Sequence, residues 1–480
     1  MKQQAFNPYL PSWEYIPDGE PRVFGDRVYV YGSHDRFNAP IFCVNDYVCW
    51  SAPVDDLSDW RYEGVIYKKN QDPRNKLGLR LLFAPDVVQG VDGRYYLYYA
   101  FDFMGMTGVA VCDTPAGEYQ FLGHVHYPDG TIWGRRKGDQ FPFDPGVLVD
   151  DDGRVWHYSG FYTPTPAIVT GGIPLKNDGG VVMELEQDMV TIKTEPKVIF
   201  PKEGPGSFEN HEFFEASSIR KDGDRYIFVY SSRHNHELCY AVSHRPDGEF
   251  QFGGTLVSLG DLFLDGRTEE KDGVNYLGNT HGGMLNIGDD WYIFYHRQTN
   301  RHSYSRQACA EKLVRTEDGR FLQAEVTSCG LNGGPLQGKG QYEARIACNL
   351  WSKDGVGRYD GSDPRKRLED HPYFTQTGKD RMEDGDQYIA NMRDGAVAGF
   401  KYFDFRNLRR VCITVGGVGG GFMQMFTQPD FSNPCGVLPV DTDGEVMDLV
   451  TECIIPDGVH ALYFRYVGPG SVDFYGFELQ

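Results

Sequence analysis

One short turn-and-strand phrase occurs five times along this chain and constrains its fold more than any other feature. Each copy is a Gly-Asp or Asp-Gly turn that runs into a strand rich in aromatic and β-branched residues. The turn glycines stand at positions 25, 93, 153, 223 and 288, so each unit is 60 to 70 residues long. Such turns join antiparallel strands, and alternating aromatics suit a strand with one buried face. Five units of this length, too long for a solenoid, predict a five-bladed β-propeller.

The pattern changes after residue 330, which indicates a second domain. A chain of 480 residues is too long for one ordinary core. The Gly-rich segment 329–340 has no strand periodicity and is the best linker candidate. Strand-like runs follow at 342–350, 387–392, 397–405, 411–415, 446–455 and 460–467, with a last one ending at 480. We therefore predict an all-β chain, with a five-bladed β-propeller in residues 1–330 and a β-sandwich in residues 340–480.

The composition excludes several classes of partner. The 47 basic and 68 acidic residues give a net charge of −21, which argues against binding to nucleic acid or an anionic membrane. The N-terminal residues lack the apolar core of a signal peptide, and no stretch approaches the roughly 20 apolar residues of a membrane span. Ten cysteines without metal-ligand spacing suit free thiols in a reducing compartment. We expect a cytoplasmic protein, and nothing in the sequence indicates its oligomeric state.

Three carboxylates occupy matched positions in different units. Asp18, Asp144 and Glu215 each stand 7 to 9 residues before the turn glycine of their unit. Equivalent positions in different blades point toward one shared axis, so these side chains are expected to converge. Converging carboxylates repel, and at least one pKa should rise. A carboxylic acid beside an ionised carboxylate is what glycoside hydrolysis requires.

Several motifs in this order resemble the successive blades of glycoside hydrolase family 43. They are Asp18 ahead of Gly25, Phe143-Asp144-Pro145, Phe213-Phe214-Glu215-Ala216-Ser217-Ser218 and Gly278-Asn279-Thr280-His281-Gly282-Gly283. Phe83-Ala84-Pro85-Asp86 is similar to the family's second-blade Trp-Ala-Pro-Asp signature, with Phe in place of Trp. The resemblance implies an inverting five-bladed-propeller hydrolase that acts on arabinose- and xylose-containing glycans.

The resemblance assigns a role to each carboxylate. Asp18 would be the general base that activates water, Glu215 the general acid, and Asp144 the group that raises the pKa of Glu215 and orients it. The family's Asp-Pro at the base position is here Asp18-Gly19-Glu20-Pro21, so Glu20 is an alternative base, although only Asp18 has the family's spacing to the turn. Glu209 and Glu212 are interpreted as surface residues.

Other residues are weaker candidates. The family's histidine at the position of His281 often lies near a calcium ion or a water cluster in the channel. His281 is therefore a tentative metal contact, directly or through water, although calcium prefers oxygen ligands and a structural or electrostatic role is the default. Arg306 resembles an arginine that reaches the sugar hydroxyls, and a salt bridge between blades explains it equally well. His34, Phe83 and Trp156 are predicted to shape the pocket, the aromatic ones by stacking on sugar C–H surfaces.

The predicted activity is an exo-acting glycosidase that releases pentose units from imported oligosaccharides and requires no cofactor. An α-L-arabinofuranosidase is the first choice and a β-xylosidase the second, with an endo-arabinanase as a third. An alternative from another functional class is a propeller that binds glycan and does not hydrolyse it. The segments 386–390, 460–468 and 472–477 resemble parts of family 6 carbohydrate-binding β-sandwiches. That module would bind glycan or pack against the catalytic domain.

Overall fold

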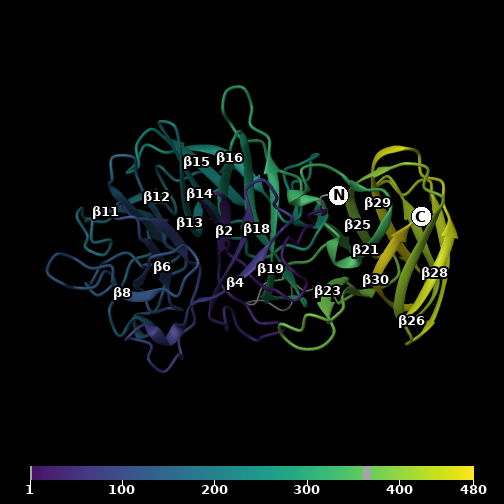
Figure 1. The fold of residues 1–480 in the computed structure, drawn as a ribbon, viewed down its shortest axis with the longest axis horizontal. Coiled ribbons are helices and arrows are strands. Elements are labelled where there is room, and N and C mark those ends of the chain that lie inside the picture. The colour runs from purple at the N-terminus through teal and green to yellow at the C-terminus, as the bar shows by residue number, and fades with distance from the viewer. Residues whose placement is uncertain (1–2, 360–368) are drawn as a thin grey trace.

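The computed structural model describes residues 3–359 and 369–480 and consists almost entirely of β-sheet (Figure 1). Five small sheets occupy the first two thirds of the chain, and one eleven-stranded sheet follows. Each small sheet is an antiparallel meander of consecutive strands, which is the structure of a propeller blade. The predicted five-bladed propeller and all-β fold class are confirmed.

The strands of the first three blades follow one another along the chain. Blade 1 holds β1 (Glu20–Phe24), β2 (Arg27–Tyr31), β3 (Tyr47–Pro53) and β4 (Arg61–Tyr67). Blade 2 holds β5 (Asp86–Gln89), β6 (Tyr95–Ala100), β7 (Thr107–Cys112) and β8 (Gln120–His124). Blade 3 holds β9 (Gly146–Val149), β10 (Val155–Gly160), β11 (Gly179–Leu185) and β12 (Lys197–Pro201).

The last two blades complete the ring. Blade 4 holds β13 (Phe213–Asp222), β14 (Arg225–Ser232), β15 (Leu238–Ser243) and β16 (Gln251–Val257). Blade 5 holds β17 (Met284–Ile287), β18 (Asp290–Thr299) and β19 (His302–Leu313). The five sequence repeats are the hairpins between the first and second strands of the blades, and the turn glycines adopt positive φ values between 61° and 83°.

The first and last blades are joined by backbone contacts. Gly19, just before β1, forms a parallel bridge with Gly282, just before β17. The Tyr9 amide donates to the Ala308 carbonyl at 3.1 Å, so the N-terminal segment runs beside β19. These contacts close the ring between two parts of the chain that are almost 300 residues apart.

Buried charges connect the inner strands inside the ring. The Arg22 guanidinium donates to both carboxylate oxygens of Asp86, with a shortest distance of 2.6 Å, and so joins blades 1 and 2. Asp86 also accepts from the Val147 amide of blade 3 at 2.9 Å. Arg220 of blade 4 donates to Glu20 of blade 1 at 2.7 Å. The alternation of cations and anions keeps the centre of the propeller neutral while it fixes the spacing of the blades.

The C-terminal sheet curls around one hydrophobic core, which confirms the sandwich-like second part (Figure 1). Its strands are β20 (Leu336–Gln337), β21 (Gly340–Glu343), β22 (Asn349–Trp351), β23 (Tyr373–Gln376), β24 (Gln387–Met392), β25 (Val397–Phe405), β26 (Arg410–Phe426), β27 (Gly436–Asp443), β28 (Met447–Glu452), β29 (Gly458–Val467) and β30 (Gly470–Leu479). The predicted runs 387–392 and 397–405 coincide with β24 and β25. The division into domains at 330 and 340 stays a prediction.

Two details of this sheet differ from the expectations. The run 342–350 is not one strand, because a 3₁₀ turn at Ala344–Ile346 separates β21 from β22. The predicted strand 411–415 is part of the 17-residue β26. The glycines between Gly416 and Gly421 hid the second half of that strand, because glycine disfavours strands unless a close neighbour requires it. Here a Cβ at Gly421 would overlap the backbone of Val467.

The C-terminal sheet packs against blade 5. The Asn300 amide donates to the Phe374 carbonyl at 2.8 Å, and the Arg297 guanidinium lies 3.7 Å from the centre of the Phe374 ring. Tyr276, which precedes β17, belongs to the hydrophobic core of the C-terminal sheet. Backbone, charge and core contacts therefore all cross between the two parts.

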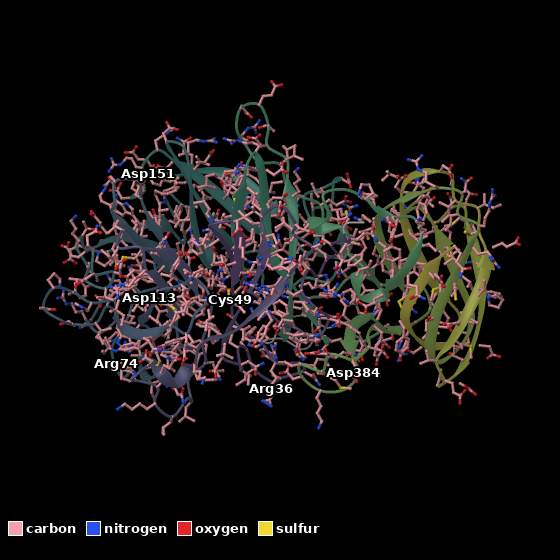
Figure 2. All side chains as sticks on the ribbon, viewed as in Figure 1. Arg36, Cys49, Arg74, Asp113, Asp151 and Asp384 are labelled. Carbon is pink, nitrogen blue, oxygen red and sulfur yellow. The ribbon has the colours of Figure 1, made fainter. Side chains whose placement is uncertain are left out.

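All ten cysteines are free and are buried or half-buried, as their scattered spacing predicts. Figure 2 shows Cys49 within the propeller and charged residues such as Asp151 and Arg74 at its edge. No helix in the described part of the chain is long and apolar enough to cross a membrane.

We predict that Gly282→Ala destabilises the propeller. The added Cβ would overlap the backbone oxygen of Phe294, which forces a backbone shift at the junction of the first and last blades. Overpacking of this kind costs about 1–3 kcal/mol and should lower the midpoint of thermal unfolding. Gly334→Ala is the matched control, because nothing lies within 4 Å of its added Cβ. Equal midpoints for the two variants would contradict this account of ring closure.

Candidate active site

A cavity of about 660 Å³ opens where the blades meet, and residues from all five blades line it. Asp18, Asp144 and Glu215, which the sequence predicts to converge, all line this cavity. Phe83, His281 and Arg306 line it as well. Residues that are separated by almost 300 positions in the sequence thus share one chamber.

Asp18 lies at the entrance to β1 and is 5% exposed. Its backbone has a φ of 58°, a left-handed conformation that Asp adopts more easily than most residues. The Asp18 amide donates to His296 Nδ1 at 3.2 Å. The other ring nitrogen of His296 contacts the Asn279 carbonyl at 2.8 Å, so Nε2 carries the proton. The imidazole therefore fixes the backbone of Asp18 and leaves its carboxylate facing the cavity.

Arg306 keeps Asp18 ionised. Burial alone would raise the pKa of Asp18, but Arg306, with a contribution from His281, lowers it below its usual value. Arg306 Nη1 donates to Asp18 Oδ1 at 2.8 Å, and Arg306 Nε donates to Asp35 Oδ2 at 2.8 Å. Arg306 thus joins β19 to blade 1, as the salt-bridge interpretation expects, and also lines the cavity. Its contact with sugar hydroxyls stays a prediction.

Glu215 lies within β13 at an irregularity of the strand. The pairing of β13 with β14 shifts on both sides of Glu215, as in a β-bulge, and Ala216 has a φ of 70°. Bulges beside active sites redirect side chains, and Ala at positive φ is strained. Burial, and next the negative charge of Asp144, raise the pKa of Glu215 well above its usual value. Glu215 is therefore suited to keep a proton at a pH where an ordinary glutamate has lost it.

Asp144 contacts both His281 and the backbone next to Glu215. It precedes β9 with a φ of 46°, and its Oδ2 accepts from the Ala216 amide at 3.1 Å. His281 Nδ1 lies 3.4 Å from the same oxygen. Burial raises the pKa of Asp144 although His281 opposes this shift. Burial lowers the pKa of His281, but Asp144 and Asp18 outweigh it and raise that pKa to about 9.

Aromatic rings form a belt around the cavity. The ring centroids of Phe42 and Phe83 are 6.2 Å apart, those of Phe83 and Phe143 are 5.6 Å apart, and those of Phe143 and Phe161 are 4.9 Å apart. Phe214 continues the series on the far side. Only Phe83 was predicted from the sequence. Phe42, Phe143 and Phe161 stand outside the strands, and Phe214, at the start of β13, has no feature in the sequence that distinguishes it from a core residue. The belt provides apolar faces for sugar C–H groups and excludes water.

The C-terminal part of the chain also contributes to the cavity wall. Arg358 and Tyr359 line the cavity although both follow β22 in the sequence. The Tyr359 amide donates to the Leu277 carbonyl at 2.7 Å, and its ring stacks on Tyr276 at 4.4 Å. Sequence reasoning missed both residues, because they lie outside the five repeats.

The structure places three candidates outside the cavity. His34 contacts Glu14 at 3.0 Å and the Asp46 carbonyl at 2.8 Å, so it supports blade 1 and does not shape the pocket as predicted. Trp156 is 5% exposed within the core between blades 3 and 4, and the same correction applies. Glu20, the alternative base, does not line the cavity, because Arg220 and Ser218 hold its Oε2 among the inner strands.

The two remaining carboxylates near Glu215 lie apart from the cavity lining. Glu209 is exposed, and Glu212 pairs with His234 at 3.0 Å. The predicted metal contact at His281 stays a prediction. Among the described residues, His211, Glu237 and Cys239 form a possible metal-binding group, because their ligand atoms lie within 4.8 Å of one another. His281 is not part of this group.

Comparison with known proteins agrees with this geometry. The sequence profile of glycosyl hydrolases family 43 matches residues 17–321. The chain belongs to this family. It is accordingly a glycoside hydrolase, and the matched region contains Asp18, Asp144 and Glu215.

A full-length relative and two solved structures are similar to this family 43 chain. A xylosidase/arabinosidase from Thermoclostridium stercorarium is 50% identical over 484 residues, which cover 100% of this chain and 99% of that protein. A family 43 arabinoxylan arabinofuranohydrolase from Bacillus subtilis, solved with cellotetraose, has a TM-score of 0.51 at 20% identity over 97% of this chain and 96% of that one. A family 43 β-xylosidase/α-arabinofuranosidase from a compost metagenome has a TM-score of 0.52 at 23% identity over 68% of this chain and 98% of that one.

We predict that Asp144→Asn moves the alkaline limb of the pH–rate profile to lower pH. Burial would still raise the pKa of Glu215, but the added contribution of the Asp144 charge would be lost, so Glu215 would lose its proton at lower pH. The measurement is kcat/KM on an oligosaccharide across the pH range. Asp152→Asn in the exposed turn of the same blade is the matched control. An alkaline limb unchanged in Asp144→Asn would remove this role from Asp144.

Proposed function

We propose that this family 43 enzyme releases single pentose units from arabinose- and xylose-containing oligosaccharides by one-step inversion. The observation that supports this most strongly is the pairing of Asp18, whose pKa is lowered, with Glu215, whose pKa is raised, in one cavity. One group is ready to accept a proton and the other to donate one, as glycoside hydrolysis requires.

The proposed reaction uses both groups in one step. Glu215 donates its proton to the glycosidic oxygen while the bond to the anomeric carbon breaks. Asp18 accepts a proton from a water molecule whose oxygen bonds to the opposite face of that carbon. Inversion requires the two carboxyl groups to be about 6.5–9.5 Å apart, which leaves room for that water. Asp144 and Arg306 hold the two groups in place and set their charges.

An α-L-arabinofuranosidase is our first choice of activity, and a β-xylosidase is the second. The name of the full-length relative covers both sugars. A cavity of about 660 Å³ with walls formed by the aromatic belt and Tyr359 suits exo action better than an endo-arabinanase, which needs an open groove. The presence of all three carboxylates argues against a glycan-binding propeller without catalysis. We further propose that the enzyme acts in the cytoplasm on imported oligosaccharides.

The proposed reaction needs no cofactor, since carboxylates carry out both proton transfers. Calcium has to be considered because one structural neighbour was solved in a form described as calcium-free. The inner-strand charges fit a directly bound calcium ion poorly. Glu20 Oε1 is buried without a partner among the described residues, but Arg220 contacts the same carboxylate. A protonated His281 cannot ligate a metal. We therefore retain only the prediction that His281 contacts a calcium ion through water. No step depends on it.

We predict that Glu215→Gln lowers kcat/KM on xylobiose or arabinobiose by about 10²–10⁴-fold, which is the usual contribution of a general acid. Hydrolysis of nitrophenyl α-L-arabinofuranoside or β-D-xyloside should be reduced far less, because nitrophenolate leaves without protonation. If the wild type hydrolyses only one of the two nitrophenyl glycosides, the result would also show whether arabinose or xylose is the preferred sugar. Glu209→Gln, an exposed neighbour, is the control. Oligosaccharide turnover at the wild-type rate in Glu215→Gln would contradict the assignment.

A further inference from the structure

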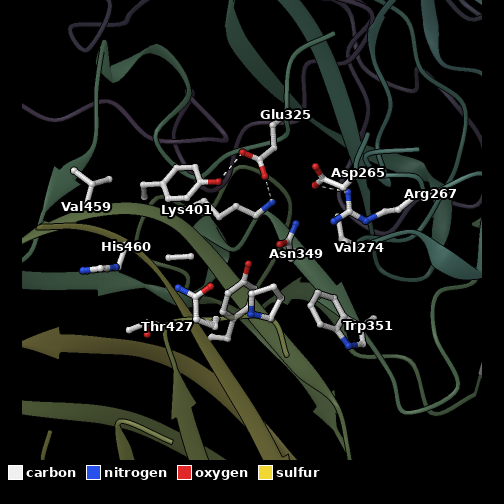
Figure 3. A pocket seen from close by; sticks show the side chains of 15 residues that line it. Asp265, Arg267, Val274, Glu325, Asn349, Trp351, Lys401, Thr427, Val459 and His460 are labelled. Atoms are coloured by element: carbon white, nitrogen blue, oxygen red, sulfur yellow. Dashed lines mark hydrogen bonds and ion pairs between the residues drawn. The ribbon is translucent and has the colours of Figure 1, made fainter. Parts of the chain in front are cut away.

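A second cavity, of about 250 Å³, lies between the propeller and the C-terminal sheet (Figure 3). The propeller contributes the segment from Asp265 to Val274 and Glu325. The C-terminal sheet contributes β22, β25, β29 and the turn after β26. Among the described residues, this interdomain cavity shares no lining residue with the catalytic cavity. Nothing in the proposed reaction uses it.

The charges that line the interdomain cavity are already paired. Lys401 Nζ lies 2.7 Å from Glu325 and 3.4 Å from Asp261, and Arg267 lies 3.2 Å from Asp265. Figure 3 shows Glu325 between the Lys401 ammonium group and a tyrosine hydroxyl. Because each of these cations has a carboxylate partner, an ionic ligand gains little here and must lose its hydration. The cavity therefore favours an uncharged ligand.

Asn349 offers a hydrogen-bond donor that the described residues do not use. Asn349 is 1% exposed, and its side-chain Nδ2 has no hydrogen-bond partner among the described residues. The backbone of Asn349 pairs with Gly399 in the ladder between β22 and β25, so the side chain stands on a rigid support. A buried amide without an acceptor is costly, and an oxygen of a ligand in the cavity would satisfy it.

Trp351 gives the interdomain cavity an aromatic wall. This half-buried residue stands two positions after Asn349 on β22 and so projects from the same face of the strand. It also lines a neighbouring groove of about 560 Å³, together with Pro429 and Val274, which are shared by both spaces. An indole packs well against the C–H face of a sugar ring. An uncharged ligand with oxygen acceptors and apolar faces is a saccharide.

We propose that the interdomain cavity is a second saccharide-binding site, in which Asn349 donates to a sugar oxygen and Trp351 packs against the ring. The site holds one sugar unit in the cavity, and the adjoining groove receives the next unit of a neutral oligosaccharide. The choice of a xylose-containing ligand rests on the proposed function, whereas the neutral character of the ligand rests on the paired charges.

The test is equilibrium dialysis of labelled xylotriose against the full chain carrying Glu215→Gln, which slows turnover. We expect two bound molecules per chain at saturation. Adding Asn349→Ala or Trp351→Ala should weaken one of the two sites by about tenfold or more, the effect of one lost hydrogen bond or ring contact. Adding Asn286→Ala, at an exposed asparagine on β17 that lines neither cavity, should change neither site. The glucuronate-substituted trisaccharide should occupy the interdomain site at least tenfold more weakly.

Two results would overturn the inference. One is a single bound xylotriose in Glu215→Gln, and the other is a second site that persists in both Asn349→Ala and Trp351→Ala. The same two substitutions in the otherwise wild-type chain should leave nitrophenyl glycoside hydrolysis unchanged, which verifies their folding. If the wild-type chain hydrolyses none of these substrates but still binds two xylotriose molecules, the result would contradict the proposed function and support the interdomain site.

Discussion

The ion pair between Arg306 and Asp18 is the interaction on which the chemistry of the cavity depends. A carboxylate as buried as Asp18 would otherwise gain a proton and could not act as a base. Arg306 contacts Asp18 at 2.8 Å and is held in place by Asp35 and by the Phe42 ring, 4.8 Å from its guanidinium carbon. Burial has the opposite effect on Glu215, because no cation among the described residues makes a comparable contact with it. One environment therefore keeps two similar side chains in opposite protonation states.

The propeller supplies the positions from which these side chains meet. Asp18 and Asp144 each precede the first strand of a blade, and Glu215 lies near the start of another. Their backbones are held in unusual conformations at Asp18, Asp144 and Ala216, and such strain persists only where the surroundings determine it fully. The hydrogen bond from the Ala216 amide to Asp144 couples two of these positions. The buried Arg22–Asp86 and Arg220–Glu20 pairs fix the inner strands beneath them.

The sequence predicts most of what depends on local periodicity and little of what depends on loops. The turn glycines identify all five blades, since each marks a hairpin that a five-fold ring repeats. The equivalent positions of Asp18, Asp144 and Glu215 follow from the same repetition. The aromatic belt, Arg358 and Tyr359 stand outside it, and only folding brings them to the cavity. Trp156 failed as a prediction because aromatic residues on strands pack inside a blade more often than they line its rim. His34, in the segment after β2, failed because Glu14 and the Asp46 carbonyl hold its ring within blade 1.

The central claim is that the cavity keeps Glu215 protonated while Asp18 is ionised. The most direct measurement is a ¹³C NMR titration of the full chain labelled at the glutamate side-chain carboxyl carbon, with wild type beside Glu215→Gln. The account predicts a wild-type carboxyl signal with a pKa well above 4.5 that is missing from the variant. Other buried glutamates such as Glu311, whose pKa burial raises to about 8, should titrate in both proteins. If every signal with a raised pKa persists in Glu215→Gln, the claim is contradicted.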